Sequence, residues 1–194
     1  MLIRTEAPAD ILVIDRLLKS VFETDAEANL VMSLRENSHL TLSLVACSDE
    51  GEVIGHLMFS PITLNGHDHN WQGLAPLAVK EEYRNQGIAK SLVEDAFSTL
   101  VDFGYPACVV LGDPAYYGRF GFKAASEFGL SCTWDVPEGA FQAIELVEGA
   151  LAGHAGEIAY SPEQDGFGTD LLSRVFKQPS YPVKKINFNR WQEC

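Results

Sequence analysis

Apolar residues recur at the helical period in three stretches of the chain. Residues 11–21 repeat them every three or four positions, which predicts a first helix. A shorter set within residues 30–34 predicts a second helix. The clearest stripe follows Gly87, and it predicts a helix from Ile88 that is closed by Gly104.

β-branched and aromatic residues gather between these helices. Two such runs around the turn 48–51 predict a hairpin over residues 40–59. A further run, residues 71–79, is interrupted by Pro76, and because proline cannot donate a ladder hydrogen bond we expect a bulged or splayed strand there. Strands are also predicted over residues 107–111 and 141–147.

The composition narrows the class of protein. A chain of 194 residues with 46% hydrophobic residues fits one globular domain with a packed core. Its 27 acidic residues outnumber the 14 basic ones and leave a net charge of −13, so we expect neither nucleic acid nor membrane as a partner. The start lacks an apolar signal core, and the four cysteines are widely spaced, which favours a cytoplasmic location.

The most informative segment lies between residues 71–79 and the predicted helix at Ile88. It reads Arg84-Asn85-Gln86-Gly87-Ile88-Ala89-Lys90. The first N–H groups of a helix have no internal partner, so a glycine-containing approach lets a phosphate reach them. The alternative is a turn glycine beside a solvated helix cap. The usual nucleotide-binding fingerprints are absent, because the chain has neither G-x-x-x-x-G-K-[ST] nor G-x-G-x-x-G.

The same residues match the pyrophosphate signature [Gln/Arg]-x-x-Gly-x-[Gly/Ala] of the GNAT superfamily of acetyl-CoA-dependent N-acetyltransferases. Two further segments resemble that family in the right order: residues 77–79 look like the end of its splayed fourth strand, and residues 117–122 resemble its Tyr-x-x-x-Gly-Phe segment. Residues 73–79 and 111–122 together are similar to the YhbS-like branch. The resemblance covers residues 1–165 and leaves residues 166–194 as a basic and aromatic extension.

This resemblance implies an α/β fold in which a twisted mixed sheet carries helices on both faces. The sheet would open as a V, where the strand ending at Val79 parts from residues 107–111, and acetyl-CoA would occupy the opening. The strand residues implied to bind its pantetheine arm are Leu77, Ala78 and Val79. The loop residues implied to hold its pyrophosphate are Arg84, Asn85, Gln86, Gly87, Ile88, Ala89 and Lys90.

The resemblance also implies direct transfer of the acetyl group to a primary amine, with Tyr117 protonating the departing thiolate. Tyr116 better suits packing against the sheet. Asp113 and Pro114 fit the N-cap and first turn of a short helix before these tyrosines. The base that deprotonates the amine stays open between a water chain, Asp113 and His56.

Other features carry less chemistry. His67-Asp68-His69 lies beside Asn65-Gly66, and we interpret it as a solvated turn rather than a metal site. His56, on an apolar strand, is expected to be a satisfied core or edge histidine. Residues 166–194 are expected to pack on this chain or on a second copy in a homodimer. Two alternatives to the enzyme stay open: a catalytically silent acyl-CoA-binding module, and an interaction protein that uses this extension.

Overall fold

The computed structural model describes residues 1–164, so the predicted extension 166–194 lies outside the described residues. Its α-helices include α1 (Ile11–Val21), α2 (Ala26–Glu36), α3 (Ile88–Asp102) and α4 (Pro114–Tyr117). Short 3₁₀ helices are η1 (Pro8–Asp10), η2 (Glu81–Tyr83), η3 (Gly118–Phe120) and η4 (Ala125–Phe128). The strands are β1 (Leu2–Thr5), β2 (Leu42–Cys47), β3 (Val53–Leu64), β4 (His67–Val79), β5 (Ala107–Leu111), β6 (Lys123–Ala124), β7 (Leu130–Cys132), β8 (Phe141–Glu145) and β9 (Gly156–Tyr160).

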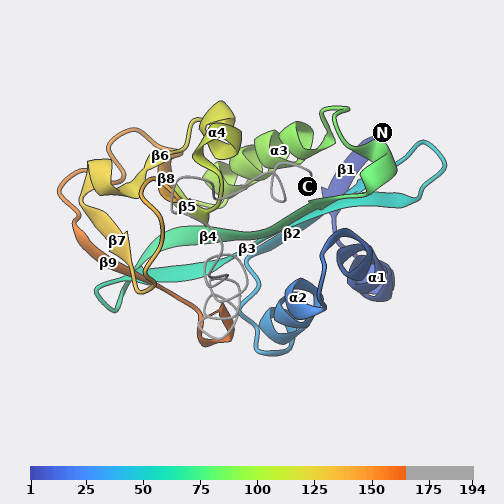
Figure 1. The fold of residues 1–194 in the computed structure, drawn as a ribbon, viewed down its shortest axis with the longest axis horizontal. Coiled ribbons are helices and arrows are strands. Elements are labelled where there is room, and N and C mark those ends of the chain that lie inside the picture. Colours follow the sequence, from blue (N-terminus) through green and yellow to red (C-terminus); the bar gives the residue numbers. More distant parts are fainter. Residues whose placement is uncertain (165–194) are drawn as a thin grey trace, which may run out of the picture.

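The strands form one mixed sheet with the order β1-β2-β3-β4-β5-β8-β6. The β4–β5 pair is parallel, as is the β7–β9 pair beyond this path, and the other pairs are antiparallel. Helices α3 and α4 lie on one face of the sheet and α1 and α2 on the other (Figure 1). The expected mixed sheet with helices on both faces is therefore confirmed.

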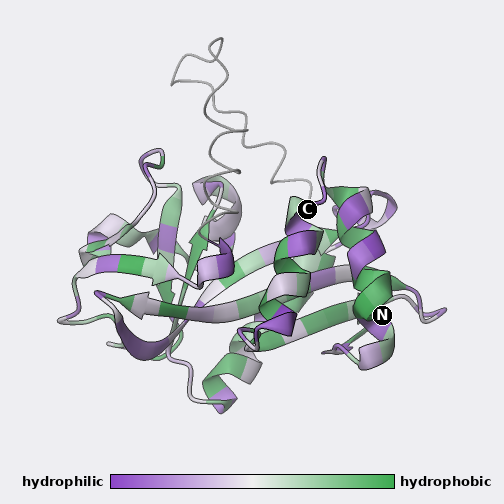
Figure 2. Cartoon of the chain, turned by 90° about the horizontal axis from the view of Figure 1, so that it is seen from below, coloured by the Kyte–Doolittle hydropathy of each residue, from purple (hydrophilic) through white to green (hydrophobic). Residues whose placement is uncertain are grey.

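Each face of the sheet buries its own set of apolar side chains. Leu57 and Phe59 of β3 pack with Leu92 of α3, whereas Met58, between them, packs with Ile14 of α1. This alternation follows from the two-residue period of a strand. Figure 2 shows hydrophobic residues along the central strands and hydrophilic residues gathered at the loops and on the helices.

Strand β4 separates from β5 partway along its length. Within residues 1–164 the two strands pair only where Gln72–Leu74 meet Cys108–Val110. On its other side β4 stays paired with β3 up to Val79, and two β4 residues, Ala75 and Pro76, stand opposite the single β3 residue Met58. The expected bulge at the proline is confirmed. Beyond it, β4 has no strand partner on the side that faces β5.

Several expected elements need correction. The second helix is longer than the stripe at 30–34 indicates, because it spans Ala26–Glu36. His67-Asp68-His69 is not a turn: these residues begin β4, and the turn consists of Asn65 and Gly66 alone. Strands β1 and β9 were not predicted, since each is short and is defined by its partner, β2 for one and β3 for the other.

Phe59 is fully buried opposite Leu74, the last β4 residue that pairs with β5. We expect Phe59→Ala to lower the free energy of unfolding by about 3–5 kcal/mol, because it removes a large buried side chain and leaves a cavity. Chemical denaturation measures this loss. Phe103, which is 64% exposed at the end of α3, supplies the matched control: Phe103→Ala should stay within about 0.5 kcal/mol of the parent. Equal losses in the two variants would contradict the assigned core.

Candidate functional site

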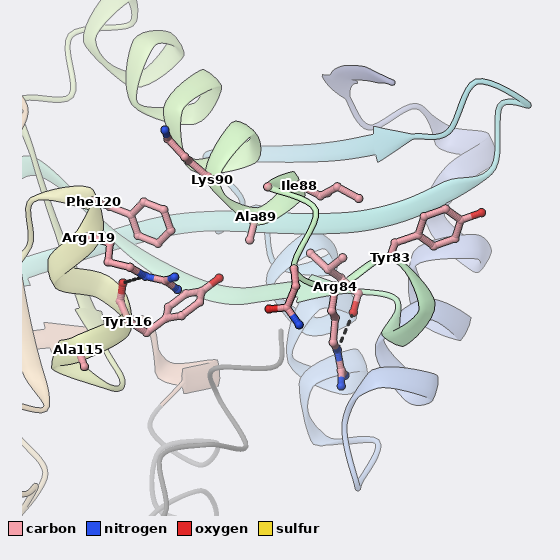
Figure 3. Close-up of a pocket in the computed structure, with 12 residues that line it drawn as sticks. Tyr83, Arg84, Ile88, Ala89, Lys90, Ala115, Tyr116, Arg119 and Phe120 are labelled. Atoms are coloured by element: carbon pink, nitrogen blue, oxygen red, sulfur yellow. Dashed lines mark hydrogen bonds between the residues drawn. The ribbon is translucent and has the colours of Figure 1, made fainter.

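A cavity of about 590 Å³ lies between the beginning of α3 and the α4–η3 segment. Its volume is in the range of small-molecule sites. One wall is the loop that enters α3, and the facing wall is α4 with η3 (Figure 3). The lining residues are Val79, Tyr83, Arg84, Asn85, Gly87, Ile88, Ala89, Lys90, Ala115, Tyr116, Arg119 and Phe120.

The loop before α3 has a backbone that suits the approach of an anion. Gly87 is the N-cap residue with φ of 81°, and Asn85 has φ of 60°, both in the left-handed region that glycine and asparagine tolerate best. No side chain caps α3, and its first turn holds no acidic residue. The unpartnered N–H groups of this turn therefore form the positive end of the helix dipole at the cavity wall.

Most of the predicted loop residues meet at this wall. Arg84, Asn85, Gly87, Ile88, Ala89 and Lys90 all line the cavity. Gln86 does not, because its side-chain amide turns back and donates to the Glu82 carbonyl at 3.2 Å.

The predicted strand residues offer their backbone rather than their side chains. Val79 lines the cavity, whereas Leu77 and Ala78 do not. The Leu77 side chain is buried on the α3 face of the sheet and the Ala78 side chain on the α1–α2 face. Since this stretch of β4 has no β5 partner among residues 1–164, its free edge carries main-chain donors and acceptors next to the cavity.

The short helix α4 is built as its sequence predicts. Asp113 is the N-cap and accepts a hydrogen bond from the Ala115 N–H at 2.8 Å, while Pro114 occupies the first turn. The Tyr117 ring then folds back over Gly112, where a Cβ would lie 2.4 Å from a ring carbon. A glycine is thus needed at the end of β5 for the tyrosine to adopt this position.

The two adjacent tyrosines lie differently from what their assignment implies. Tyr116 lines the cavity, and its ring meets that of Tyr117 edge-on at 5.1 Å between centroids. Tyr117 is buried behind it against Gly112, outside the cavity wall. Tyr116 therefore does more than pack against the sheet, and the role of Tyr117 as an acid stays a prediction.

Arg119 and Phe120 are cavity residues that the sequence reasoning missed. Arg119 holds its guanidinium over the Tyr116 ring, with 4.4 Å from Cζ to the ring centroid. The available signal was the spacing of three residues between Tyr116 and Arg119, which places two side chains on the same side of a helical turn.

The candidate base His56 lies on β3, with its side chain on the face of the sheet that α1 and α2 cover. Its side chain is fully buried, and Nε2 lies 2.9 Å from Ser43 Oγ. Ser43 donates its only proton to the Glu6 carboxylate, so His56 Nε2 must donate to Ser43 and Nδ1 must carry the lone pair. Nδ1 has no hydrogen-bond partner among the described residues, so the expectation of a satisfied histidine holds for one ring nitrogen only.

Burial sets the protonation state of His56, and two nearby charges modify its pKa. Burial lowers its pKa from 6.5 to about 4, and the nearby Arg35 lowers it too, while Glu6 partly opposes them. Glu6 is itself held by two hydrogen bonds from Arg35 at 2.8 and 2.9 Å. Burial raises the pKa of Glu6, but the hydrogen bonds from Arg35 and Ser43 outweigh it and leave that pKa lowered. His56 is therefore neutral and Glu6 ionised at pH 7.

The described residues were also compared with the requirements of a metal site and of a membrane-spanning helix. Among residues 1–164, no group of three or more His, Cys, Asp or Glu side chains is arranged to hold a metal ion. His69 instead meets the rings of Trp71 and His154 at 5.3 and 4.7 Å. None of the helices in the described part of the chain is long and apolar enough to span a bilayer.

Comparison with known proteins gives a consistent result. Residues 12–122 match the model of the acetyltransferase (GNAT) family. The chain is 52% identical to the uncharacterized N-acetyltransferase YhbS of Escherichia coli K12 over 160 residues, which cover 82% of this chain and 96% of YhbS. It is 35% identical to the uncharacterized N-acetyltransferase YjhQ of the same strain, over 60% of this chain and 67% of YjhQ.

Solved structures agree with these matches. The crystal structure of E. coli YhbS in complex with CoA superposes with a TM-score of 0.83 at 51% identity, covering 84% of this chain and 91% of the other. A GNAT family acetyltransferase from Brucella melitensis in complex with acetyl-CoA gives a TM-score of 0.70 at 32% identity, covering 84% and 97%.

The buried His56 should make stability depend on pH. The unfolded chain takes up a proton near pH 6.5, whereas the folded chain resists protonation down to about pH 4. The contribution of His56 to the free energy of unfolding is therefore fully present above pH 6.5. It is lost as the pH falls from 6.5 to 4, by on the order of 3 kcal/mol in total. Urea denaturation at half-unit pH intervals measures this slope.

The matched variants are His56→Gln, which keeps an amide donor toward Ser43 but does not titrate, and His67→Gln, at the exposed start of β4. We expect the slope above pH 5, where carboxylates contribute least, to vanish in His56→Gln and to persist in His67→Gln. A parent slope retained by His56→Gln would assign the pH dependence to other groups.

Proposed function

The chain belongs to the GNAT family of acetyltransferases, and from this premise we propose that it transfers the acetyl group of acetyl-CoA to a primary amine by direct attack on the thioester. The enzyme class and the acyl donor follow from the family. The residues that bind and react are our assignment, and one observation carries it: the uncapped beginning of α3 and the unpaired edge of β4 border one cavity.

The α3 end of the cavity fits the diphosphate of coenzyme A. Gly87 approaches without a side chain, and a Cβ there would enter open space, which is where a ligand needs room. The uncapped N–H groups from Ile88 to Lys90 then supply donors, and Arg84 and Lys90 supply positive charge. These contacts act at short range, so the distant acidic surface opposes them little through salt water.

The free edge of β4 fits the peptide-like pantetheine arm. Residues Leu77 to Val79 can hydrogen-bond its amides as a further strand would, because β5 has diverged from them. We assign to a main-chain N–H of the same edge the stabilisation of the negative charge that develops on the thioester oxygen. Such a donor is typically worth about 10²–10³ in rate.

Proton transfer involves two different groups. The Tyr117 hydroxyl is assigned to protonate the leaving sulfur, a task for which a phenol carries its proton at neutral pH. On the amine side, Asp113 is engaged as the cap of α4, and His56 is fully buried; neither residue lines the cavity. This favours a water chain for removal of the amine proton.

The setting of the enzyme is proposed more coarsely. The three described cysteines, Cys47, Cys108 and Cys132, are free thiols, as is typical of a reducing cytoplasm. A net charge of −13 favours a cationic amine as acceptor. The division into an acetyltransferase domain of residues 1–165 and an extension of residues 166–194, which could contact a second copy, stays a prediction.

Binding of the donor is tested by thermal unfolding with CoA. At a ligand concentration of about 100 times Kd, we expect a stabilisation of about 2.7 kcal/mol, or several degrees in Tm. Gly87→Glu should abolish this shift, because it places a carboxylate in the anion-binding loop.

Gly66→Glu is the matched control for this variant. Gly66 has nearly the same φ of 80° and equally open surroundings but lies in the β3–β4 turn, so this variant should keep the full CoA shift. The absence of a shift in the well-folded parent at millimolar CoA would overturn the proposed function. A shift that survives in Gly87→Glu would overturn the placement of the diphosphate.

The acid role of Tyr117 is tested by following CoA thiol release with a panel of primary amines. Tyr117→Phe should slow release about 100-fold while CoA binding stays within about twofold, since only the proton donor is lost. Gly112→Ala should also slow release, because its Cβ displaces the Tyr117 ring.

Gly118→Ala is the control for Gly112→Ala, since it adds the same methyl group in open space at a helical φ and should be silent. Unchanged release in Tyr117→Phe would remove the tyrosine from the mechanism. A parent that binds CoA but releases no thiol with any amine would favour the silent acyl-CoA-binding module.

A further inference from the structure

We propose that Arg119 is a specificity residue that binds a phosphate group of the acyl donor from the side of the cavity opposite the α3 N-terminus. The inference rests on the proposed function, because it concerns the same cavity. It adds a binding group outside the loop at residues 84–90.

Arg119 is held in place before any ligand arrives. Its Nε donates to the Tyr116 carbonyl at 3.2 Å, and its guanidinium stacks on the Tyr116 ring at 4.4 Å, with the Phe120 ring centroid 6.0 Å away. A guanidinium carries five N–H donors in one plane. With Nε engaged, the four N–H groups of the two Nη atoms keep a fixed orientation, so little freedom is lost when they bind an anion.

The charge of Arg119 is not compensated by the protein. Acidic residues outnumber basic ones in this chain, and five other described cations form ion pairs with carboxylates: Arg4 with Asp10, Arg35 with Glu6, Lys19 with Asp15, Lys80 with Glu52 and Lys90 with Glu94. Within residues 1–164, Arg119 has no carboxylate in ion-pairing distance and rests on aromatic rings instead. A cation kept apart from so many acids, in a cavity wall, is available to an external anion.

The opposite wall presents the complementary part of an anion site. Figure 3 shows the Arg119 guanidinium beside the Tyr116 ring, across the cavity from the loop that carries Arg84. An anion between the walls would meet helix N–H groups on one side and the guanidinium fork on the other. The bidentate match of guanidinium and phosphate makes a phosphate group the chemistry that this arrangement recognises.

Coenzyme A carries two groups of this chemistry, the 5′-diphosphate and the 3′-phosphate of its ribose. The experiment measures Kd by titration calorimetry for the full chain with CoA and with 3′-dephospho-CoA. The variants are Arg119→Gln, which removes the charge, Arg119→Lys, which keeps the charge but loses the fork, and Arg16→Gln as a control. Arg16 lies on α1, outside the cavity, and donates to its own helix at Leu12.

We expect Arg119→Gln to raise the Kd for CoA about tenfold or more, as loss of a charge-assisted hydrogen bond does, and Arg16→Gln to leave it unchanged. The Kd of the parent should rise more steeply with salt than that of Arg119→Gln, a difference that a purely structural role would not produce. The Kd of Arg119→Lys for CoA should lie closer to that of Arg119→Gln than to that of the parent. Because lysine keeps an aliphatic side chain and a charge, this variant still tests the proposal if Arg119→Gln does not fold.

The dephospho ligand distinguishes the two phosphate groups. If Arg119→Gln and the parent bind 3′-dephospho-CoA equally, Arg119 contacts the 3′-phosphate; if the tenfold difference persists, it contacts the diphosphate. A Kd for CoA within twofold of the parent in both Arg119 variants, with the parent binding CoA, would overturn the assignment of Arg119 alone. A parent that does not bind CoA would overturn the proposed function together with it.

Discussion

The divergence of β4 from β5 after Leu74 is the constraint on which the rest of the site depends. Two parallel strands that stayed paired would satisfy each other's main-chain groups and leave nothing for a ligand. The bulge at Ala75 and Pro76 ends that pairing, while β3 continues to hold β4 on its other side. The unpaired edge is therefore held in place, which is what a binding surface made of backbone requires.

The cavity next to this edge shows how a strongly acidic protein can bind an anionic ligand. The donors that we propose are main-chain N–H groups and three cationic side chains that line the cavity, Arg84 and Lys90 on one wall and Arg119 on the facing one. Because surface charges are screened over about 8 Å at physiological salt, the local arrangement outweighs the net charge of −13. The same acidic surface remains free to attract a cationic amine, so donor and acceptor can be selected by different parts of one molecule.

The face of the sheet away from the cavity contributes support. Arg35, Glu6, Ser43 and His56 form a buried polar chain that runs from α2 across β2 to β3, and His56 pairs with Ala78 of β4 in the ladder. A network of this kind is costly unless each member is satisfied. Among these four side chains, His56 Nδ1 is the buried atom without a partner, and His56 must stay neutral on the strand that pairs with the β4 segment assigned to the donor.

Local patterns in the sequence determined the long helices, the β2–β3 hairpin, the bulge at Pro76 and the Asp113 cap, because period, proline chemistry and capping act within a few residues. The loop at residues 84–90 could also be predicted from the sequence, since a helix that begins after a glycine is a local feature. The tertiary structure decided what depends on distant partners. It placed Tyr116 in the cavity wall and Tyr117 behind it, brought Arg119 opposite the α3 N-terminus, and enclosed His56 with Glu6 and Arg35. Short strands such as β1 and β9 belong to the same class, because a strand of four or five residues exists only by pairing with a neighbour that the fold supplies.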